Sequence, residues 1–345
     1  MPAQLAVSLR TLLQGSLDYA GMFPPARLPL DEAWAKYLEA HASPYRWLLR
    51  SFVFPIGQLD ALAQLWAATP APLARFTAIG TLPDAGLKSQ AADASLLAAF
   101  YRRVATEAGP PVELSYEVRP PAAATADAAA WTAHCNALDA ALRQAEVPLS
   151  EIFIEVPLEP QRLASLSPPA TDSCWSWGLK FRTGGLTADA FPTAETLAGV
   201  VAAMATGFQP PQTQDPHSAV LRRYKATAGL HHPLPLDASE LGATMHGFIN
   251  LFVAAVLASS TASAHDAIGN PTSSSLQPAD PQVLVQAILQ ERDPQAFRFD
   301  ERQLCWRDRC ASLAVIARAR RLHLLGFGSC SFDEPVADLQ SLGWI

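Results

Sequence analysis

Two lysines, Lys180 and Lys225, lie near the ends of two successive strand-like segments of this sequence. A third such segment ends in the run from Gly328 to Ser331. A lysine that is buried or that lies beside another cation has a lowered pKa, and its neutral amine can then attack a carbonyl carbon. We therefore expect Lys225 to lower the pKa of Lys180, and Lys180 to form a Schiff base.

Charged residues alternate with apolar ones along the same segments. In the run Leu179-Lys180-Phe181-Arg182 the two cations share one face, because successive side chains of a strand point to opposite sides. Apolar faces should meet helices, which leaves the polar faces inside a barrel. The residues placed on such faces are Glu113, Ser115, Glu117, Lys180, Arg182, Arg223, Lys225 and Thr227. Glu117, or Glu155 at the end of a further strand, is the expected proton-transfer group.

The elements that carry these residues alternate between strands and helices. Alanine- and leucine-rich stretches with helical spacing separate most of the strand-like runs, which predicts a parallel sheet with helices outside. The expected strands are 16–20, 47–54, 75–80, 112–119, 151–156, 177–182, 222–228 and 322–328. Eight strands favour one (β/α)8 barrel over the whole chain. A doubly wound open sheet with a separate cap is the alternative.

One long segment interrupts the repeat. About 100 residues separate Lys225 from Ser329, where a simple barrel repeat needs far fewer. We expect an insertion over residues 230–320, with helices at 241–259 and 281–290, a polar loop at 259–278 and short strands at 297–299 and 304–307. It is either a lid or oligomer contact at the catalytic mouth, or an elaboration of an outer helix.

Three segments resemble a known family. Lys180-Phe-Arg-Thr183-Gly184 resembles the strand-six segment of deoxyribose-phosphate aldolases and related class I aldolases, and Lys225-Ala-Thr-Ala-Gly229 resembles their strand-seven segment. The run Gly328-Ser329-Cys330-Ser331 resembles their last strand. The segments Lys225 to Pro233 and Gly328 to Pro335 also resemble bacterial proteins whose activity is not assigned.

The aldolase resemblance implies roles for individual residues. Lys180 would form the Schiff base, Lys225 would lower its pKa, and the last strand would help to bind a substrate phosphate. The implied substrate-binding residues are Arg182, Thr183, Gly184, Thr227, Gly229, His231, His232, Gly328, Ser329 and Ser331. The sequence departs from the family at Arg182 and in the acids that follow Ser331, which oppose a bound phosphate. The substrate is therefore a small oxo-acid or sugar-like carbonyl compound, phosphorylated or not.

Histidines supply a competing interpretation. His231, His232 and His246, with an acidic partner, are ligand types that suit zinc, manganese or iron in a barrel lyase or hydrolase. The sequence has no His-x-His or His-Glu-x-x-His pair, so we assign no metal to the site. A non-catalytic binding barrel is the third interpretation.

Composition narrows the class of protein. Of the 345 residues half are hydrophobic and 17% are charged, and the net charge is -7, which argues against a general nucleic-acid surface. The longest apolar run is too short to span a bilayer, and no dinucleotide or triphosphate loop is present, so no cofactor is expected. Five scattered cysteines and the lack of a secretory pattern predict reduced thiols in the cytoplasm. The expected partner is a small-molecule substrate, with a homo-oligomer allowed.

Overall fold

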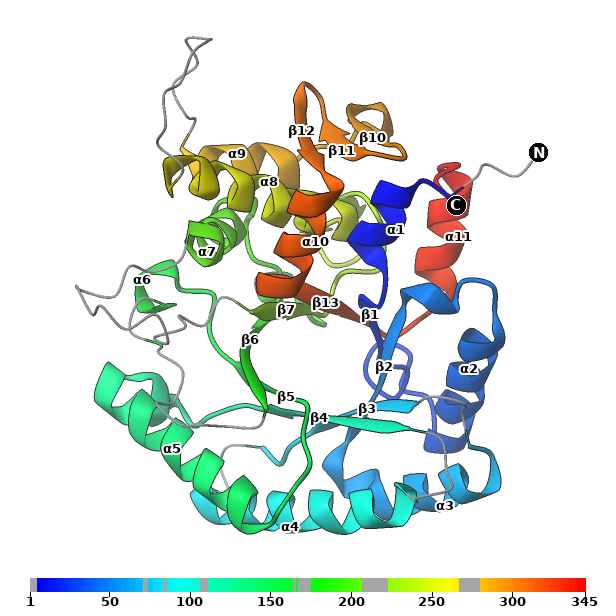
Figure 1. The fold of residues 1–345 in the computed structure, drawn as a ribbon, viewed down its shortest axis with the longest axis vertical. Coiled ribbons are helices and arrows are strands. Elements are labelled where there is room, and N and C mark those ends of the chain that lie inside the picture. The colour runs from blue at the N-terminus through cyan, green and yellow to red at the C-terminus, as the bar shows by residue number, and fades with distance from the viewer. Residues whose placement is uncertain are drawn as a thin grey trace.

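The structure, a computed structural model, describes residues 5–70, 74–82, 86–105, 111–163, 166, 175–206, 223–266 and 280–345. Eight parallel strands close into a barrel, with the first strand paired to the last (Figure 1). They are β1 (Leu17–Tyr19), β2 (Leu49–Pro55), β3 (Ala74–Ile79), β4 (Val112–Val118), β5 (Glu151–Glu155), β6 (Ser176–Arg182), β7 (Tyr224–Thr227) and β13 (Leu324–Ser329). The expected (β/α)8 barrel is confirmed.

Helices surround the barrel (Figure 1). They are α1 (Val7–Leu13), α2 (Leu30–Ala42), α3 (Leu59–Ala68), α4 (Gly86–Val104), α5 (Ala128–Gln144), α6 (Pro160–Leu163), α7 (Ala194–Thr206), α8 (Phe248–Asp266), α9 (Pro281–Leu289), α10 (Leu313–Leu322) and α11 (Asp333–Ser341). Short 3-10 turns are η1 (Arg46–Leu48), η2 (Ile56–Gln58), η4 (Ala122–Thr125), η5 (Ala188–Ala190) and η6 (Pro294–Ala296).

The outward faces of the strands hold the apolar residues that the alternation predicts. Leu179 and Phe181 of β6 and Tyr224 of β7 are buried, and the rings of Phe181 and Tyr224 meet at 5.6 Å. Burying one such side chain stabilises the fold by about 1.5–3 kcal/mol. The intervening residues, Lys180 and Lys225, are thereby turned into the barrel.

The segment between β7 and β13 differs in part from the expectation. Residues 243–245 form β9 (Ala243–Met245), which pairs with β8 (Leu236–Ala238), so the helix expected from residue 241 begins at Phe248 instead. Because α8 continues to Asp266, the first part of the expected polar loop is helical, and its remainder lies outside the described residues.

The small sheet of this segment packs at the side of the barrel rather than over the mouth. Its strands are β10 (Phe297–Phe299), β11 (Gln303–Trp306) and β12 (Arg309–Ser312). β10 and β11 contact α1, which leads into the amino end of β1, and α8 contacts α7, α9 and α10. Catalytic groups of barrels gather at the carboxyl ends of strands, so this sheet is no lid. The small sheet and α8 thus lie in the outer helical layer.

A disulfide overturns the expectation that all five cysteines are reduced. Cys305 of β11 and Cys310 of β12 are bonded, with Cα atoms 4.1 Å apart. The two strands are antiparallel and place these residues directly opposite each other, a pairing that the sequence spacing did not reveal. Cys135 and Cys330 are free thiols. Within the described residues, no helix combines the length and the apolar character needed to cross a membrane.

Candidate active site

Lys180 and Lys225 lie side by side inside the barrel. They are directly paired in the register of β6 and β7, and their side chains are only 5% and 2% exposed. The ring of Phe153, from β5, lies 4.6 Å from the Lys225 Nζ and contributes a cation–π contact. The strand alternation thus delivers the expected pair of amines to one place.

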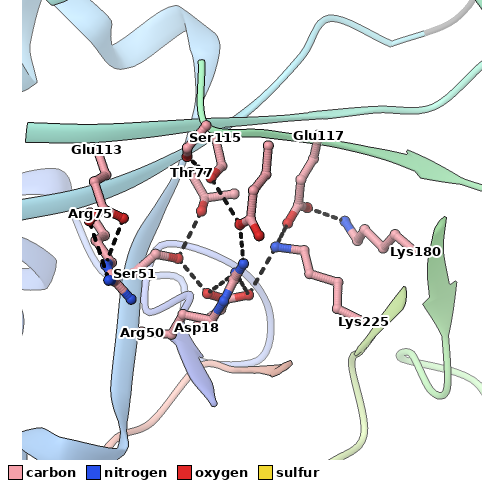
Figure 2. Close-up of polar contacts among 12 residues, drawn as sticks. Asp18, Arg50, Ser51, Arg75, Thr77, Glu113, Ser115, Glu117, Lys180 and Lys225 are labelled. Atoms are coloured by element: carbon pink, nitrogen blue, oxygen red, sulfur yellow. Dashed lines mark hydrogen bonds and ion pairs between the residues drawn. The ribbon is translucent and has the colours of Figure 1, made fainter. Parts of the chain in front are cut away.

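Glu117 of β4 joins the two amines. Its Oε2 lies 2.6 Å from the Nζ of Lys180, and its Oε1 contacts the Nζ of Lys225 (Figure 2). Burial alone would raise the pKa of Glu117, but the charges of Lys180 and Lys225 outweigh it and hold the pKa below its usual value. Glu117 is therefore an ionised bridge, and the two amines are separated by little more than one carboxylate.

The protonation state of Lys180 differs from the expectation. Burial lowers its pKa, but Glu117 and Glu155, whose Oε2 lies 3.1 Å from the Nζ, outweigh burial and raise the pKa above the ordinary value. The prediction that Lys225 leaves Lys180 with a lowered pKa is therefore wrong for the resting site. The sequence did not reveal that the carboxylates of Glu117 and Glu155 both contact the Nζ of Lys180.

Asp18 of β1 is the second partner of Lys225. Its Oδ2 accepts a hydrogen bond of 2.9 Å from the Nζ, and Arg50 and Ser51 of β2 donate to the same carboxylate. Burial would raise the pKa of Asp18, but Arg50 and then Lys225 lower it to about 2. Thr77 of β3 donates to the Ser51 hydroxyl at 2.8 Å and so orients that group.

Glu155 lies between Lys180 and two arginines at the carboxyl end of the barrel. Arg119 donates to its Oε1 at 2.8 Å, and the Nε of Arg182 lies 3.5 Å from the same oxygen. Despite burial, Lys180 and then Arg182 and Arg119 lower the pKa of Glu155 to about 2. The side chains of Arg119 and Arg182 are 44% and 47% exposed, so each reaches solvent while contacting Glu155.

The loops that follow β6 and β7 are clasped together. The hydroxyl of Thr183 donates to the carbonyl of Ala228 at 2.7 Å, and a Cβ added to Gly184 would lie 2.8 Å from the Cα of Gly229. Gly229 has a φ of +71°, which favours glycine. These expected substrate-binding residues thus hold the mouth together. Thr227 packs against Gly328, where a Cβ would come within 2.7 Å of the threonine Oγ1.

The polar groups of the expected phosphate-binding segment already form hydrogen bonds with neighbouring residues. The Ser329 hydroxyl accepts from the amide of Ser331 at 3.3 Å, and the Ser331 hydroxyl accepts from the amide of Glu334 at 3.1 Å. The Nδ1 of His231 lies 3.2 Å from Glu334 and 3.5 Å from the Ser329 Oγ. Burial lowers the pKa of His231. A phosphate placed here would have to displace a carboxylate.

Of the three histidines of the metal interpretation, His231 and His232 both lie near Glu334, at 3.2 and 3.9 Å, whereas His246 has a partner of its own. The Nδ1 of His232 lies 2.6 Å from Asp338, and the Nε2 of His246 lies 2.7 Å from the carbonyl of Pro192. Burial lowers the pKa of His246. Among the described residues no group of three His, Cys, Asp or Glu side chains is arranged to hold a metal ion. These contacts do not favour a metal centre at the histidines.

Several residues of the site were missed by the sequence argument. Asp18, Arg50 and Arg119 were not among the expected site residues. The register between β1 and β2 shifts next to Asp18, so simple alternation fails for Arg50 and Ser51, both of which contact Asp18. The one available signal was a charged residue within an otherwise apolar strand.

No protein-family model, no curated protein and no solved structure matches the chain. The resemblance to class I aldolases therefore stays a prediction that three short segments carry.

Proposed function

We propose that the protein is a Schiff-base-forming lyase of the aldolase type, with Lys180 as nucleophile. The observation that supports this most is the pair of buried lysines in register on β6 and β7, joined through one carboxylate. Buried charges destabilise a fold unless they are paired, and a barrel gains little stability from such a network compared with apolar packing. A functional role accounts for their presence.

Lys180 must lose a proton before it can react. At pH 7 fewer than about one in a thousand amines with an ordinary lysine pKa is neutral, and the raised pKa of Lys180 reduces that fraction further. Glu117 is a poor acceptor for this proton, because Lys225 also contacts it and favours its ionised form. Glu155 is the other carboxylate within reach, at 3.1 Å.

A substrate with an anionic group would make Glu155 a better base. Arg119 and Arg182 now contact Glu155, and both are partly exposed at the mouth. A carboxylate or phosphate that draws these guanidinium groups toward itself weakens their contact with Glu155, whose pKa then rises. The proton of Lys180 can pass to Glu155, so binding of the correct substrate activates the nucleophile.

The remaining proton transfers involve only Lys180, Glu155 and the substrate. The neutral Lys180 Nζ forms a bond to the carbonyl carbon as the carbon–oxygen π bond breaks, and a proton passes from this nitrogen to the oxygen to give a neutral carbinolamine. Protonated Glu155 then donates its proton to the departing hydroxyl, which leaves as water, and a protonated imine remains. That imine withdraws electrons from the neighbouring carbon–carbon bond, which can then be cleaved or formed. The substrate class is a small oxo-acid or an anionic sugar-like carbonyl compound.

Borohydride trapping tests this proposal. The protein is incubated with glyoxylate, pyruvate, glyceraldehyde and glyceraldehyde phosphate in separate reactions, reduced, and mapped by peptide mass spectrometry. We expect a reduced adduct on Lys180 with at least one compound, and none in Lys180→Met. The variant Lys36→Met, which removes an exposed surface lysine, should be trapped like the wild type. Absence of a Lys180 adduct across the panel, with the protein folded, would rule the proposal out.

One observation favours a second candidate, a non-catalytic binding barrel. Lys180 is fully charged in the resting site and contacts two carboxylates, as in a structural ion-pair network. On that interpretation, carbonyl compounds bind reversibly at the mouth without any covalent adduct. Calorimetric binding of glyoxylate or pyruvate that survives in Lys180→Met, together with failed trapping, would support it.

A further inference from the structure

A cavity of about 280 Å³ opens at the amino ends of the strands, at the opposite end of the barrel from Arg182. Glu113 is the second residue of β4, whereas Glu151 and Ser176 are the first residues of β5 and β6. Arg75 and Glu113 are 43% and 45% exposed and lie where the cavity meets solvent. The cavity thus opens at the other end of the barrel from the mouth, although Arg50 and Ser51 in its lining also contact Asp18.

The lining of this cavity consists of arginine, glutamate and serine side chains. Three of these side chains are cationic, Arg50, Arg75 and Arg223, and two are anionic, Glu113 and Glu151, so the lining carries one positive charge in excess. Arg320 adds a further cation close to this end, because it donates to the carbonyls of Gln14 and Leu324 beside the amino ends of β1 and β13. An apolar ligand finds no matching surface here.

Hydrogen-bond donors remain available in the cavity. Arg50 is occupied, because it donates to Asp18 and contacts Glu151. Arg223 donates one hydrogen bond of 2.7 Å to Glu151 through its Nη2, but its buried Nε has no hydrogen-bond partner among the described residues. Arg75 contacts Glu113 through its Nε at 2.8 Å and its Nη2 at 3.3 Å. A guanidinium group has five N–H donors, so Arg223 and Arg75 each retain donors for a further oxygen. The hydroxyls of Ser51 and Ser150 already donate to Asp18 and to the Leu114 carbonyl, so the arginines are the main donors for a ligand.

We propose that this cavity binds a small oxyanion, a carboxylate or a phosphate, between Arg75 and Arg223. Both guanidinium groups present planar pairs of N–H donors that match the oxygens of such anions. The volume corresponds to about nine water molecules at ~30 Å³ each, which is enough for a compact metabolite and too little for a nucleotide. The side chains of Glu113 and Glu151 compete for the same donors and limit the affinity.

The figure shows how this cavity relates to the lysines. Arg75 and Glu113 lie at one side of the view, Asp18 and Arg50 in the middle, and Lys180 at the other side (Figure 2). Arg50 lines the inner side of the cavity. In the contacts drawn, Asp18 accepts hydrogen bonds from both Arg50 and Lys225 and is the link between them. Binding of an anion at the amino end therefore does not depend on Schiff-base chemistry at Lys180.

Isothermal titration calorimetry on the full chain tests the site with inorganic phosphate, glycerol phosphate and succinate. We expect at least one to bind with a Kd in the millimolar range or below. Arg223→Gln should weaken binding about tenfold or more, since a hydrogen bond to a charged group contributes roughly 1.5–3 kcal/mol. Arg103→Gln, which removes a surface arginine paired with Asp60, is the matched control and should bind as the wild type does. The anion that binds identifies the source as phosphate, phosphate ester or carboxylate.

Two further variants test whether the charge of the cavity controls binding and at which end of the barrel the anion binds. Glu113→Gln removes a competing acceptor and raises the positive excess, so binding should tighten about threefold, an outcome that a purely structural ion pair does not produce. Arg182→Gln removes a cation of the mouth, so it should weaken any binding of anions there and leave the binding that depends on Arg223 unchanged. The proposal is overturned if none of the three anions binds, if Arg182→Gln rather than Arg223→Gln abolishes binding, or if Glu113→Gln weakens it. If Arg223→Gln fails to fold, the direction of the Glu113→Gln effect decides.

Discussion

The two ends of the barrel interior use different cations. Toward the carboxyl end, Lys180 and Lys225 contact Glu117 and Glu155 closely, and lysine can lose and regain a proton. Toward the amino end, the cations are arginines, which stay protonated, and they border a cavity. The contrast indicates that one end suits chemistry in which a proton moves, whereas the other suits holding a fixed negative charge.

Asp18 is the residue that belongs to both ends. It accepts hydrogen bonds from Arg50 on one side and from Lys225 on the other. If the two ends are electrically joined, removal of this single carboxylate should disturb both. Variants that affect one end alone, or both ends together, test this connection.

The largest expected effect is on stability, in Asp18→Asn. The variant leaves two buried cations without a shared counter-charge, and breaking a buried ion pair destabilises a protein by about 3–5 kcal/mol. Urea unfolding should show a loss of about 3 kcal/mol or more. Asp60→Asn, at an exposed ion pair, is the control and should lose less than about 1 kcal/mol. A loss in Asp18→Asn no greater than in the control would mean that the two ends are held independently.

The pH dependence of stability gives a finer test of the same carboxylate. The pKa of Asp18 is lowered from 3.8 to about 2, so its contribution is fully present above 3.8 and is lost as the pH falls through about 2. The shift corresponds to about 2 kcal/mol. The stability difference between wild type and Asp18→Asn should therefore shrink by about 1 kcal/mol between roughly pH 6 and pH 3. A difference that grows on acidification would contradict the assigned direction.

Glu117→Gln should change the lysine end alone. Because Glu117 is the carboxylate that raises the pKa of Lys180 most, its neutral analogue should lower that pKa. Borohydride trapping near neutral pH should then become about tenfold faster, with the rise of rate with pH displaced to lower pH. Slower trapping would identify Glu117, rather than Glu155, as the base. Anion binding at the amino end should be the same as in wild type.

The smallest expected effects distinguish the two anion-binding regions. Arg182→Gln should raise KM for an anionic carbonyl compound about threefold and leave a neutral aldehyde unaffected, as expected for a partly exposed charge. Arg223→Gln should not change either KM. Steady-state kinetics with glyoxylate and propanal provide the measurement. Equal effects of the two variants on both compounds would remove the distinction between the mouth and the amino end.

Strand alternation and helical spacing in the sequence were enough to predict the barrel and the inward orientation of the two lysines. Alternating polarity placed Lys180 and Lys225 on inward faces, and each of the eight expected strands overlaps one in the structure. Among the short strands, the predictions at 297–299 and 304–307 are confirmed as β10 and β11, whereas β8 and β12, which have less apolar and aromatic character, were missed. The Cys305–Cys310 bond was missed for the same reason, since it depends on the β11–β12 pairing.

The electrostatics of the site depended on contacts that the sequence does not reveal. Glu117 lies 63 positions before Lys180 and contacts it only because the barrel closes. The register shift beside Asp18 then brings Arg50 to the same carboxylate. The pKa of Lys180 is raised because two carboxylates lie within a few ångströms of its amine. The sequence showed only the neighbouring cation, Lys225, which would lower the pKa.

The clasp between the loops after β6 and β7 has a practical consequence for engineering. A Cβ at Gly184 or Gly229 would collide with the other loop, and the Thr183 hydroxyl ties the same two loops together. These contacts keep β6 and β7 from sliding, and so keep the spacing of the two amines constant. On the proposed function, a library that varies positions 185–190 while retaining Thr183, Gly184 and Gly229 should alter substrate preference and leave Lys180 as the trapped lysine. The clasp thus marks the boundary between what directed evolution can vary and what it has to leave unchanged.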